Sequence, residues 1–355
     1  MGDYVIILAI DTSCDETAAA VTRNSEIVSS VIWSQSSLHA SFGGVIPSLA
    51  QRQHQERIDW VVERAIKNCK LKIKNCDAIA VTTGPGLAIA LGVGINKARE
   101  LAIKYKKPLI PINHIEAHLL SPFVNSKFDS EAGRVILNSK FPMFGLVLSG
   151  GTTVLCLVKG IGDYEMLAET ADDALGEALD KAARLLGLGY PGGAILEKFA
   201  RSGNPNKYNL PFPLQNDKVK NRFSYSGLKT AFVRLFEGIK NPTKEDISDL
   251  AASFQSRAFD HILKVLEYHC SLKVTSLLFG GGVANNIELK KRLRKLCKKH
   301  GIKLHVPYTN KLNGDNAAMI GVTAYLKNKN VKNLNSKYGG IEIIESIDRN
   351  PKLKL

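Results

Sequence analysis

Apolar and polar positions follow the same order in two separate stretches of the chain. The apolar run Ile6–Ile10 is followed by the polar segment Asp11–Glu16 and by a second apolar run, Ala18–Val21. The second copy consists of Phe144–Leu148, Ser149–Thr153 and Val154–Val158. Each copy predicts a β-hairpin whose tight turn presents backbone N–H groups and hydroxyls suited to phosphate. The repetition predicts two similar α/β halves.

Two further apolar runs predict buried strands, each followed by a glycine turn and a helix. The first series is Ala78–Thr82, Thr83–Gly86 and a small-residue helix at roughly Gly92–Ile103. The second series is Val274–Phe279, Gly280–Gly282 and a helix that Val283–Asn286 opens, with the apolar stripe Leu289, Leu293 and Leu296. A strand, a glycine turn and a helix N-terminus together form an anion site. Plain tight turns also use glycine, so the three turns favour nucleotide binding without proving it.

The composition is that of a globular protein with room for about two domains in its 355 residues. We expect the boundary between them at Asn125–Lys140, and a basic, partly ordered tail from about Leu326. No apolar run approaches the roughly 18 residues that cross a bilayer, so no membrane partner is expected. The six cysteines lack C-x-x-C spacing and fit free thiols. The strand-like start without a targeting pattern predicts a cytoplasmic protein, with the mitochondrial matrix or a plastid as the alternative.

The net charge of +15 indicates a polyanionic partner, with nucleic acid as the first candidate. A Lys- and Asn-rich genome would produce the same composition. One basic patch covers the outer face of a predicted helix, at Lys290–Arg292, Arg294–Lys295 and Lys298–Lys299. A second patch, Lys218–Arg222, lies beside Phe223 and Tyr225. Either patch could bind RNA phosphates or stack on exposed bases, although a solvated helix face explains the first equally well.

Two histidines, His114 and His118, are spaced four residues apart. On a helix this spacing puts both imidazoles on one face, where they can bind one metal ion. A zinc peptidase helix would carry its general-base Glu directly after the first His, whereas Glu116 lies two residues on. The pair therefore indicates a metal clamp without peptidase machinery. Two surface histidines would show the same spacing, so the metal interpretation stays open on this motif alone.

Three acidic residues, Asp11, Asp15 and Glu16, crowd the first predicted turn. Carboxylates next to a phosphate-binding turn are unfavourable unless they position water, a cation or a proton acceptor. The alternative is a solvent-exposed Asx-turn. Cys14 has no flanking His, so we interpret it as a packing residue and not a nucleophile.

The order of these motifs resembles that of the tRNA N6-adenosine threonylcarbamoyltransferases, the TsaD family, over about Ile6 to Ala324. The segments that carry the resemblance are Ile10–Thr17, Phe42–Pro47, Thr83–Leu87, Asn113–Leu119, Asp172–Lys181, Tyr190–Gly193, Phe223–Lys229, Gly280–Val283 and Gly314–Asn316. Two positions depart from the family pattern. Thr152 stands where His or Asn is usual, and Ser48 stands where Glu is common.

The resemblance implies an α/β fold of the actin/Hsp70/hexokinase type, with two duplicated lobes and a ligand cleft between them. The implied lobes are residues 1–128 and 129–312, followed by a helix at 313–325 that returns to the first lobe and the tail at 326–355. It implies a metal ion, iron or zinc, held by His114, His118 and Asp315. Asp315 precedes a small-residue segment, Ala317–Ala324.

The resemblance also assigns the nucleotide site. The implied residues are Val147, Leu148, Ser149, Gly150, Gly151, Asp180, Gly193 and Asn286. An Asp is a common acceptor for ribose hydroxyls, and glycine allows close approach of the backbone. Two physical alternatives remain, because Asp180 could form a surface ion pair with Arg184, and Asn286 could be a helix N-cap.

The implied activity is transfer of a threonylcarbamoyl group from threonylcarbamoyl-AMP to N6 of the adenosine 3′ to the anticodon, in tRNAs reading ANN codons. Asp15 and Glu16 are then the candidates for general base and positioning residue. TsaB-like and TsaE-like protein partners are implied as well. The first alternative is an ATPase or kinase of the same fold, which the histidine pair disfavours because Mg²⁺ prefers oxygen ligands. The second is a non-catalytic nucleotide-binding scaffold.

Overall fold

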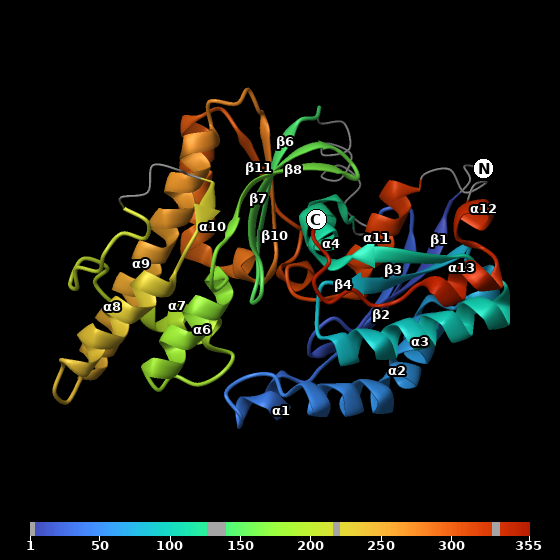
Figure 1. The fold of residues 1–355 in the computed structure, drawn as a ribbon, viewed down its shortest axis with the longest axis horizontal. Helices are drawn as coiled ribbons and strands as arrows, with labels where there is room; N and C mark the ends of the chain where they lie inside the picture. The colour runs from blue at the N-terminus through green and yellow to red at the C-terminus, as the bar shows by residue number, and fades with distance from the viewer. Residues whose placement is uncertain (1–3, 126–139, 216–220, 329–333) are drawn as a thin grey trace. The chain divides into compact units, whose positions relative to one another are not determined.

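The computed structural model describes residues 4–125, 140–215, 221–328 and 334–355 (Figure 1). The described chain divides into two compact units. Unit 1 contains the described residues of Met1–Leu38, Val45–Ser139 and Val306–Leu355, and unit 2 those of His39–Gly44 and Lys140–His305. The chain returns to unit 1 at Val306, directly after the last strand of unit 2, whereas the sequence interpretation placed this return at residue 313. Residues 126–139, which make up most of the expected boundary Asn125–Lys140, lie outside the described residues, as do the patch residues Lys218–Lys220.

Unit 1 is built on a five-stranded sheet in the order β3-β2-β1-β4-β5. The strands are β1 (Ile6–Asp11), β2 (Glu16–Arg23), β3 (Glu26–Ser34), β4 (Ala78–Gly84) and β5 (Leu109–Asn113). The first three are antiparallel neighbours, which confirms the first predicted hairpin. β4 and β5 run parallel to β1. Because the carboxyl ends of parallel strands meet at one edge, the residues that follow β1, β4 and β5 gather there.

Helices cover both faces of this sheet. The helices of unit 1 are α2 (Pro47–Cys69), α3 (Ala88–Tyr105), α4 (His114–Leu120), α11 (Ala317–Lys327), α12 (Leu334–Tyr338) and α13 (Ile341–Ser346). The short helix α1 (Ser36–Ala40) lies where the chain first leaves this unit. Short 3₁₀ turns lie at Ile73–Asn75, Ser121–Phe123 and Asn310–Leu312. Leu8 and Ile10 of β1 belong to the same buried cluster as residues of α2 and α3. Ala9, which lies between Leu8 and Ile10, points to the other face of the sheet and is close to Gly321 of α11. Helix α11 therefore covers the face opposite to α2 and α3.

The C-terminal segment is more structured than the predicted partly ordered tail. It contains α12 and α13, and its last residues lie beside the carboxyl ends of β4 and β5. The Asn350 amide donates to the Thr83 carbonyl at 2.7 Å. Asn113 Nδ2 donates to the Lys354 carbonyl at 2.7 Å. Gly84 permits this approach, because a Cβ there would lie 1.8 Å from the Asn350 carbonyl oxygen.

Unit 2 is built on a six-stranded sheet in the order β11-β10-β6-β7-β8-β9. The strands are β6 (Met143–Leu148), β7 (Thr153–Gly160), β8 (Asp163–Thr170), β9 (Arg222–Phe223), β10 (Ser276–Gly280) and β11 (Lys303–His305). β6 and β7 form the second predicted hairpin. β10 and β11 run parallel to β6, so β8-β7-β6-β10-β11 repeats the order and directions of the unit 1 sheet. The predicted duplication is confirmed.

The helices of unit 2 are α6 (Leu175–Leu185), α7 (Gly192–Ala200), α8 (Ser226–Glu237), α9 (Lys244–His269) and α10 (Ile287–Lys299). Two helix starts differ from the prediction. α3 begins at Ala88 and not near Gly92, because the turn before it ends at Gly86. Gly282–Asn285 is a 3₁₀ turn, and α10 begins only after Asn286, whose side chain caps it by accepting from the Leu289 amide. None of the described helices is both long and apolar enough to cross a membrane.

Two expectations about side-chain exposure are wrong. Phe223 and Tyr225 are fully buried, so neither ring can stack on an exposed base. They pack edge-on against the ring of His261 on α9. The inward stripe of α10 is completed by Cys297, while Leu296 is only half-buried.

Candidate metal centre and nucleotide pocket

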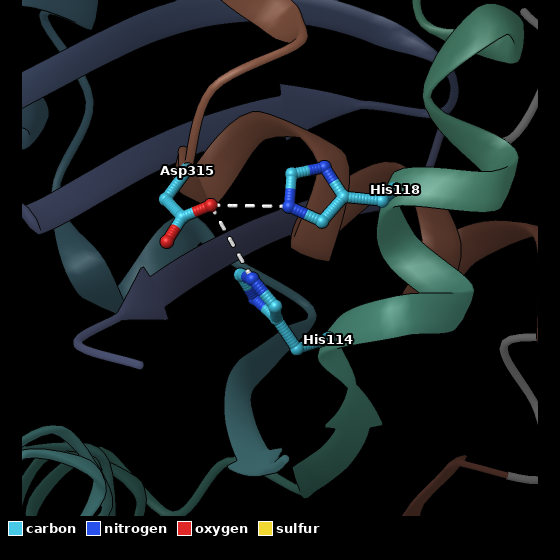
Figure 2. Close-up of side chains that lie close together, drawn as sticks. All are labelled: His114, His118 and Asp315. Carbon is cyan, nitrogen blue, oxygen red and sulfur yellow. Dashed lines mark hydrogen bonds and ion pairs between the residues drawn. The ribbon is translucent and has the colours of Figure 1, made fainter. Parts of the chain in front are cut away.

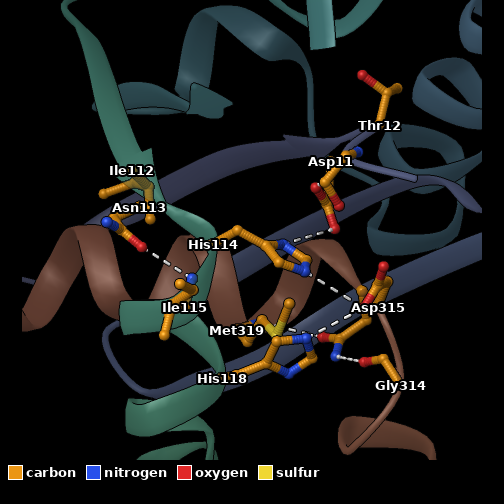
Figure 3. Close-up of polar contacts among 12 residues, drawn as sticks. Asp11, Thr12, Ile112, Asn113, His114, Ile115, His118, Gly314, Asp315 and Met319 are labelled. Carbon is orange, nitrogen blue, oxygen red and sulfur yellow. Dashed lines mark hydrogen bonds and ion pairs between the residues drawn. The ribbon is translucent and has the colours of Figure 1, made fainter. Parts of the chain in front are cut away.

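The histidine pair lies on α4, directly after strand β5. Asn113 caps this helix, because its Oδ1 accepts from the amides of Ile115 and Glu116 at 2.8 and 3.2 Å. The cap fixes where the helix starts, so His114 falls in its first turn and His118 one turn later. Figure 3 shows Asn113 beside Ile115, with both imidazoles on the side of α4 that faces Asp315.

Asp315 completes a cluster with the two imidazoles (Figure 2). Its Oδ1 lies 3.3 Å from His114 Nε2 and 3.0 Å from His118 Nε2. The two rings are 4.6 Å apart between centroids and nearly perpendicular. Asn316 caps α11 by accepting from the Met319 amide at 3.0 Å, and this fixes the turn that carries Asp315. The structure therefore brings together the three predicted metal ligands from two distant parts of the sequence.

The donor set fits a metal ion. Metal–ligand distances of about 2.0–2.1 Å place the donor atoms of a tetrahedral site roughly 3.3 Å apart, close to the distances from Asp315 to both histidines. Two imidazoles and one carboxylate suit iron or zinc and leave positions for substrate. The Nδ1 atoms of both histidines are buried without a hydrogen-bond partner among the described residues, and His114 Nδ1 faces Asp11 Oδ2 at 3.8 Å. A carboxylate behind a histidine is typical of the outer shell of metal sites.

Electrostatics in the metal-free cluster favour one proton on His114. Burial alone would lower the pKa of His114, but the carboxylates of Asp315 and Asp11 outweigh it and raise this pKa to about 9. Burial lowers the pKa of His118 despite its contact with Asp315. The two imidazoles hold the pKa of Asp315 far below its usual range, although burial opposes them. The cluster thus holds an ionised carboxylate, as a metal site requires.

The acidic loop that connects β1 and β2 is fixed from two sides. The Ser34 hydroxyl donates to Glu16 Oε1 at 3.0 Å, and the Gln35 amide donates to the Asp15 carbonyl at 3.0 Å. Burial, together with the carboxylates of Asp315 and Asp15, raises the pKa of Glu16 to about 10. A cation bound by His114, His118 and Asp315 would offset the charge of Asp315 and lower the pKa of Glu16. The carboxyl group of Glu16 is therefore close enough to the cluster of His114, His118 and Asp315 for its pKa to depend on the charge there.

His54 of α2, which sequence reasoning did not single out, holds the same loop from the other side. Its Nε2 lies 3.0 Å from the Cys14 carbonyl oxygen, and its Nδ1 lies 2.8 Å from the Thr17 hydroxyl. His54 is fully buried. One His on a long helix carries no sequence signal of its own, so only the fold reveals this contact. Burial and neighbouring carboxylates raise the pKa of the Cys14 thiol, in keeping with a packing residue.

Unit 2 contains a cavity of about 280 Å³ at the carboxyl ends of its strands. Four predicted nucleotide residues are among those that line it: Gly150, Asp180, Gly193 and Asn286. Asp180 Oδ1 accepts from the Gly193 amide at 2.7 Å, and the Arg184 guanidinium instead donates to the Gly43 carbonyl. Burial raises the pKa of Asp180, against the effect of the Gly193 and Gly192 amides. Asp180 thus belongs to the cavity wall.

The other predicted residues, Val147, Leu148, Ser149 and Gly151, are not among the described residues that line this cavity. Val147 and Leu148 are buried in β6, and the Ser149 amide donates to the Thr152 carbonyl, so it is not available to a phosphate in this conformation. Gly150 and Gly151 are exposed. Asn286 both caps α10 and donates through Nδ2 to Gln255 Oε1 at 2.9 Å. Gln255, a buried polar residue of α9, is a second contact that the sequence did not indicate.

Comparison with known proteins identifies similar sequences over most of the chain. A model of the family described as TsaD, tRNA N6-adenosine threonylcarbamoyltransferase, matches residues 26–322. A protein of that name from Persephonella marina is 43% identical over 328 residues, which cover 91% of this chain and 90% of the relative. The namesake from Geotalea uraniireducens is 42% identical and covers 91% and 92%. That from Pelagibacter ubique is 40% identical and covers 93% and 91%.

Solved structures share the fold at low sequence identity. HypF from T. kodakarensis matches 93% of this chain and 49% of its own, with a TM-score of 0.58 and 17% identity. Component A of (R)-2-hydroxyglutaryl-CoA dehydratase from Acidaminococcus fermentans matches 92% and 99%, with a TM-score of 0.51 and 12% identity. These likenesses and the duplicated sheets confirm the expected fold of the actin/Hsp70/hexokinase type.

Proposed function

Because the chain belongs to the tRNA N6-adenosine threonylcarbamoyltransferase family, we propose that it transfers a threonylcarbamoyl group from threonylcarbamoyl-AMP to tRNA. The acceptor is N6 of the adenosine 3′ to the anticodon, in tRNAs reading ANN codons, and AMP is released. The observation that carries the proposal is the family match, which extends over the metal cluster and over the unit 2 cavity.

The cavity of unit 2 would bind the adenylate part of the donor. Asp180, fixed by the Gly193 amide, is suited to accept hydrogen bonds from ribose hydroxyls. Asn286 would contribute through the cavity wall that it shares with Gln255. The exposed Gly150 and Gly151 would admit the phosphate to the backbone of the turn after β6. Val147, Leu148 and Ser149 would fix the position of that turn.

The metal ion would be held by His114, His118 and Asp315. When bound, iron or zinc would supply Lewis-acid polarisation of the acyl phosphate. Asp11 would keep the His114 imidazole oriented from behind, since its carboxylate faces the Nδ1 atom. The enzyme is thus proposed to be metal-dependent.

The acidic loop would handle the proton of the acceptor. The adenosine N6 attacks the carbamoyl carbon, the new N–C bond forms, and the bond from that carbon to the phosphate oxygen breaks. AMP leaves with this oxygen, and N6 gives up one proton to a base. Asp15 and Glu16 are proposed as that base and its positioning partner, because Ser34, Gln35 and His54 hold the loop in place.

TsaB-like and TsaE-like proteins are proposed as partners, and the reaction is proposed to take place in the cytoplasm. The test is mass spectrometry of nucleosides from unmodified tRNA, after incubation with metal-loaded protein, the partners, threonine, bicarbonate and ATP. We expect one threonylcarbamoyl group on the adenosine 3′ to the anticodon, and none on a transcript with guanosine there. Absence of the modified nucleoside, while a known family member produces it in parallel, would refute the proposal.

A further inference from the structure

From Lys291 onward, helix α10 presents an exposed face that consists only of basic residues, whereas Ile287 in its first turn is an exposed apolar residue. Between Lys291 and Lys298 every exposed position is a cation, namely Lys291, Arg294, Lys295 and Lys298. With 3.6 residues per turn, these four lie within an arc of about 100°. The opposite side of the helix buries Leu289, Leu293 and Cys297. We call these four residues the α10 stripe.

The stripe differs from the other basic residues of the same helix. Arg292 binds Glu288 and Asp260 at 2.8 and 2.9 Å, and Lys299 binds Glu267 at 2.6 Å. Among the residues that the structure describes, none of the four stripe residues forms an ion pair. Their charges are therefore not used to stabilise the fold of unit 2.

The spacing of the stripe is unfavourable for the helix itself. Lys291 lies three, four and seven residues before the other three members, so like charges stand next to one another on adjoining turns. The helix dipole favours a cation in the last turn, where Lys298 lies, but it does not favour Lys291 in the first half. A row of unpaired cations is stabilised when a polyanion binds it.

The location of α10 connects the stripe to the proposed donor site. The residue that caps the helix, Asn286, lines the cavity of unit 2. The stripe then extends from roughly 7 to 18 Å beyond this residue along the helix axis, at 1.5 Å per residue. A tRNA whose adenosine reaches the donor must pass its backbone near this cavity. Protein interfaces usually have an apolar centre, which the stripe lacks, whereas a nucleic acid backbone offers charge alone.

We propose that the α10 stripe binds the phosphate backbone of the tRNA substrate. This inference rests on the proposed function, since it takes tRNA as the acceptor. The stripe would supply affinity and orientation without reading sequence, as phosphate contacts do. The adenylate cavity and the metal ligands would be unaffected by its loss.

The test uses the full chain with Lys291, Arg294, Lys295 and Lys298 all changed to Gln. The matched control changes Arg64, Lys67, Lys70 and Lys74, which are exposed in unit 1, to Gln, so that the net charge falls equally. Binding of an unmodified tRNA transcript is measured over a series of salt concentrations. We expect the stripe variant to bind at least about tenfold more weakly, with a salt slope reduced by about 3, since each of the four lost phosphate contacts contributes roughly 0.7–0.9. The control is expected to bind as the wild type does.

Two further measurements separate the possible failures. AMP binding and the melting temperature are expected to be unchanged, and the pairs K291Q/K295Q and R294Q/K298Q are expected to give partial losses. Equal tRNA affinity of the stripe variant and the control would overturn the proposal, even if the wild type modifies tRNA. Loss of binding to a protein partner alone, with tRNA binding intact, would assign the stripe to that partner instead. Failure of the wild type to modify tRNA would contradict the proposed function itself.

Discussion

The imidazole of His54 lies between the Cys14 carbonyl, 3.0 Å from Nε2, and the Thr17 hydroxyl, 2.8 Å from Nδ1. A carbonyl oxygen can only accept, so Nε2 must carry the proton, and Nδ1 of the neutral ring then accepts from Thr17. Asp15 and Glu16, the proposed proton acceptors, lie between these two anchors in the chain. One buried side chain therefore sets the backbone on both sides of the acidic pair.

Replacing His54 is expected to lower kcat more than it changes the KM for tRNA. H54A should lose about 10- to 100-fold in kcat, because a small displacement of a reacting group has effects of that size. H54Q keeps a donor near the position of Nε2, whereas H54N keeps an acceptor near that of Nδ1. The two variants should therefore each recover part of the rate, and metal content should not change.

The control for His54 is His305, a buried imidazole of β11 that contacts Ser276 at 3.3 Å. H305Q should lower the melting temperature and leave kcat unchanged. A folded H54A variant that turns over at the wild-type rate would show that the acidic loop does not depend on this clamp.

The cluster of His114, His118 and Asp315 leads to a prediction that is tested by metal content and not by activity. Changing His118 to Ala, or Asp315 to Asn, removes one of three ligands and should lower metal affinity by more than the roughly 10- to 100-fold typical of outer-shell changes. Metal content after dialysis, measured by plasma mass spectrometry, reports this loss. E116Q is the control on the same helix, because Glu116 binds Lys327 at 2.7 Å and is not a ligand of the cluster. Full metal content in D315N would contradict the assignment.

Metal uptake is expected to depend on pH through His114. The raised pKa of His114, about 9, means that the metal-free cluster holds a proton at neutral pH, and a ligand imidazole must lose it. Affinity should therefore increase about tenfold per pH unit from pH 7 to pH 9 and level off above. The metal-free fold is stabilised by the same proton below the ordinary histidine pKa of about 6.5, and it loses this stabilisation as the pH rises through about 9. Uptake that releases no proton at pH 7, followed with an indicator dye, would contradict the assigned protonation.

Gly281 should be essential where its neighbour Gly282 is not. Gly281 has a φ of +91°, and a Cβ there would lie 2.3 Å from the Leu148 carbonyl oxygen. G281A should destabilise the protein by about 1–3 kcal/mol and weaken AMP binding, because the turn after β10 is pushed away from β6. A Cβ at Gly282 would have no atom within 4 Å, so G282A should unfold in urea as the wild type does. Equal stability of the two variants would show that the turn relaxes without cost.

Local patterns predicted the parts of this molecule that depend on neighbours in sequence. The hairpins β1–β2 and β6–β7 were predicted because apolar runs flank a polar turn, and the histidine pair because four residues make about one helical turn. Asp315 could be connected to that pair only through the family resemblance, since the whole of unit 2 lies between them in the sequence and no spacing rule spans such a distance. His54 and Gln255 carry no pattern at all, because their roles arise from packing. Phe223 and Tyr225 were predicted to be exposed but are buried, because an aromatic residue next to basic residues in the sequence can pack in the core as well as lie on the surface.

The contacts between the C-terminal segment and the ends of β4 and β5 have a consequence for biosynthesis. His114 and His118 emerge from the ribosome early. So do Thr83 and Asn113, whose partners Asn350 and Lys354 are made much later. Asp315 and this closing segment emerge only after all of unit 2 has been made. The nascent chain therefore carries two imidazoles without their carboxylate for most of translation. The metal ion proposed above could therefore be held by all three ligands only after unit 2 has been made.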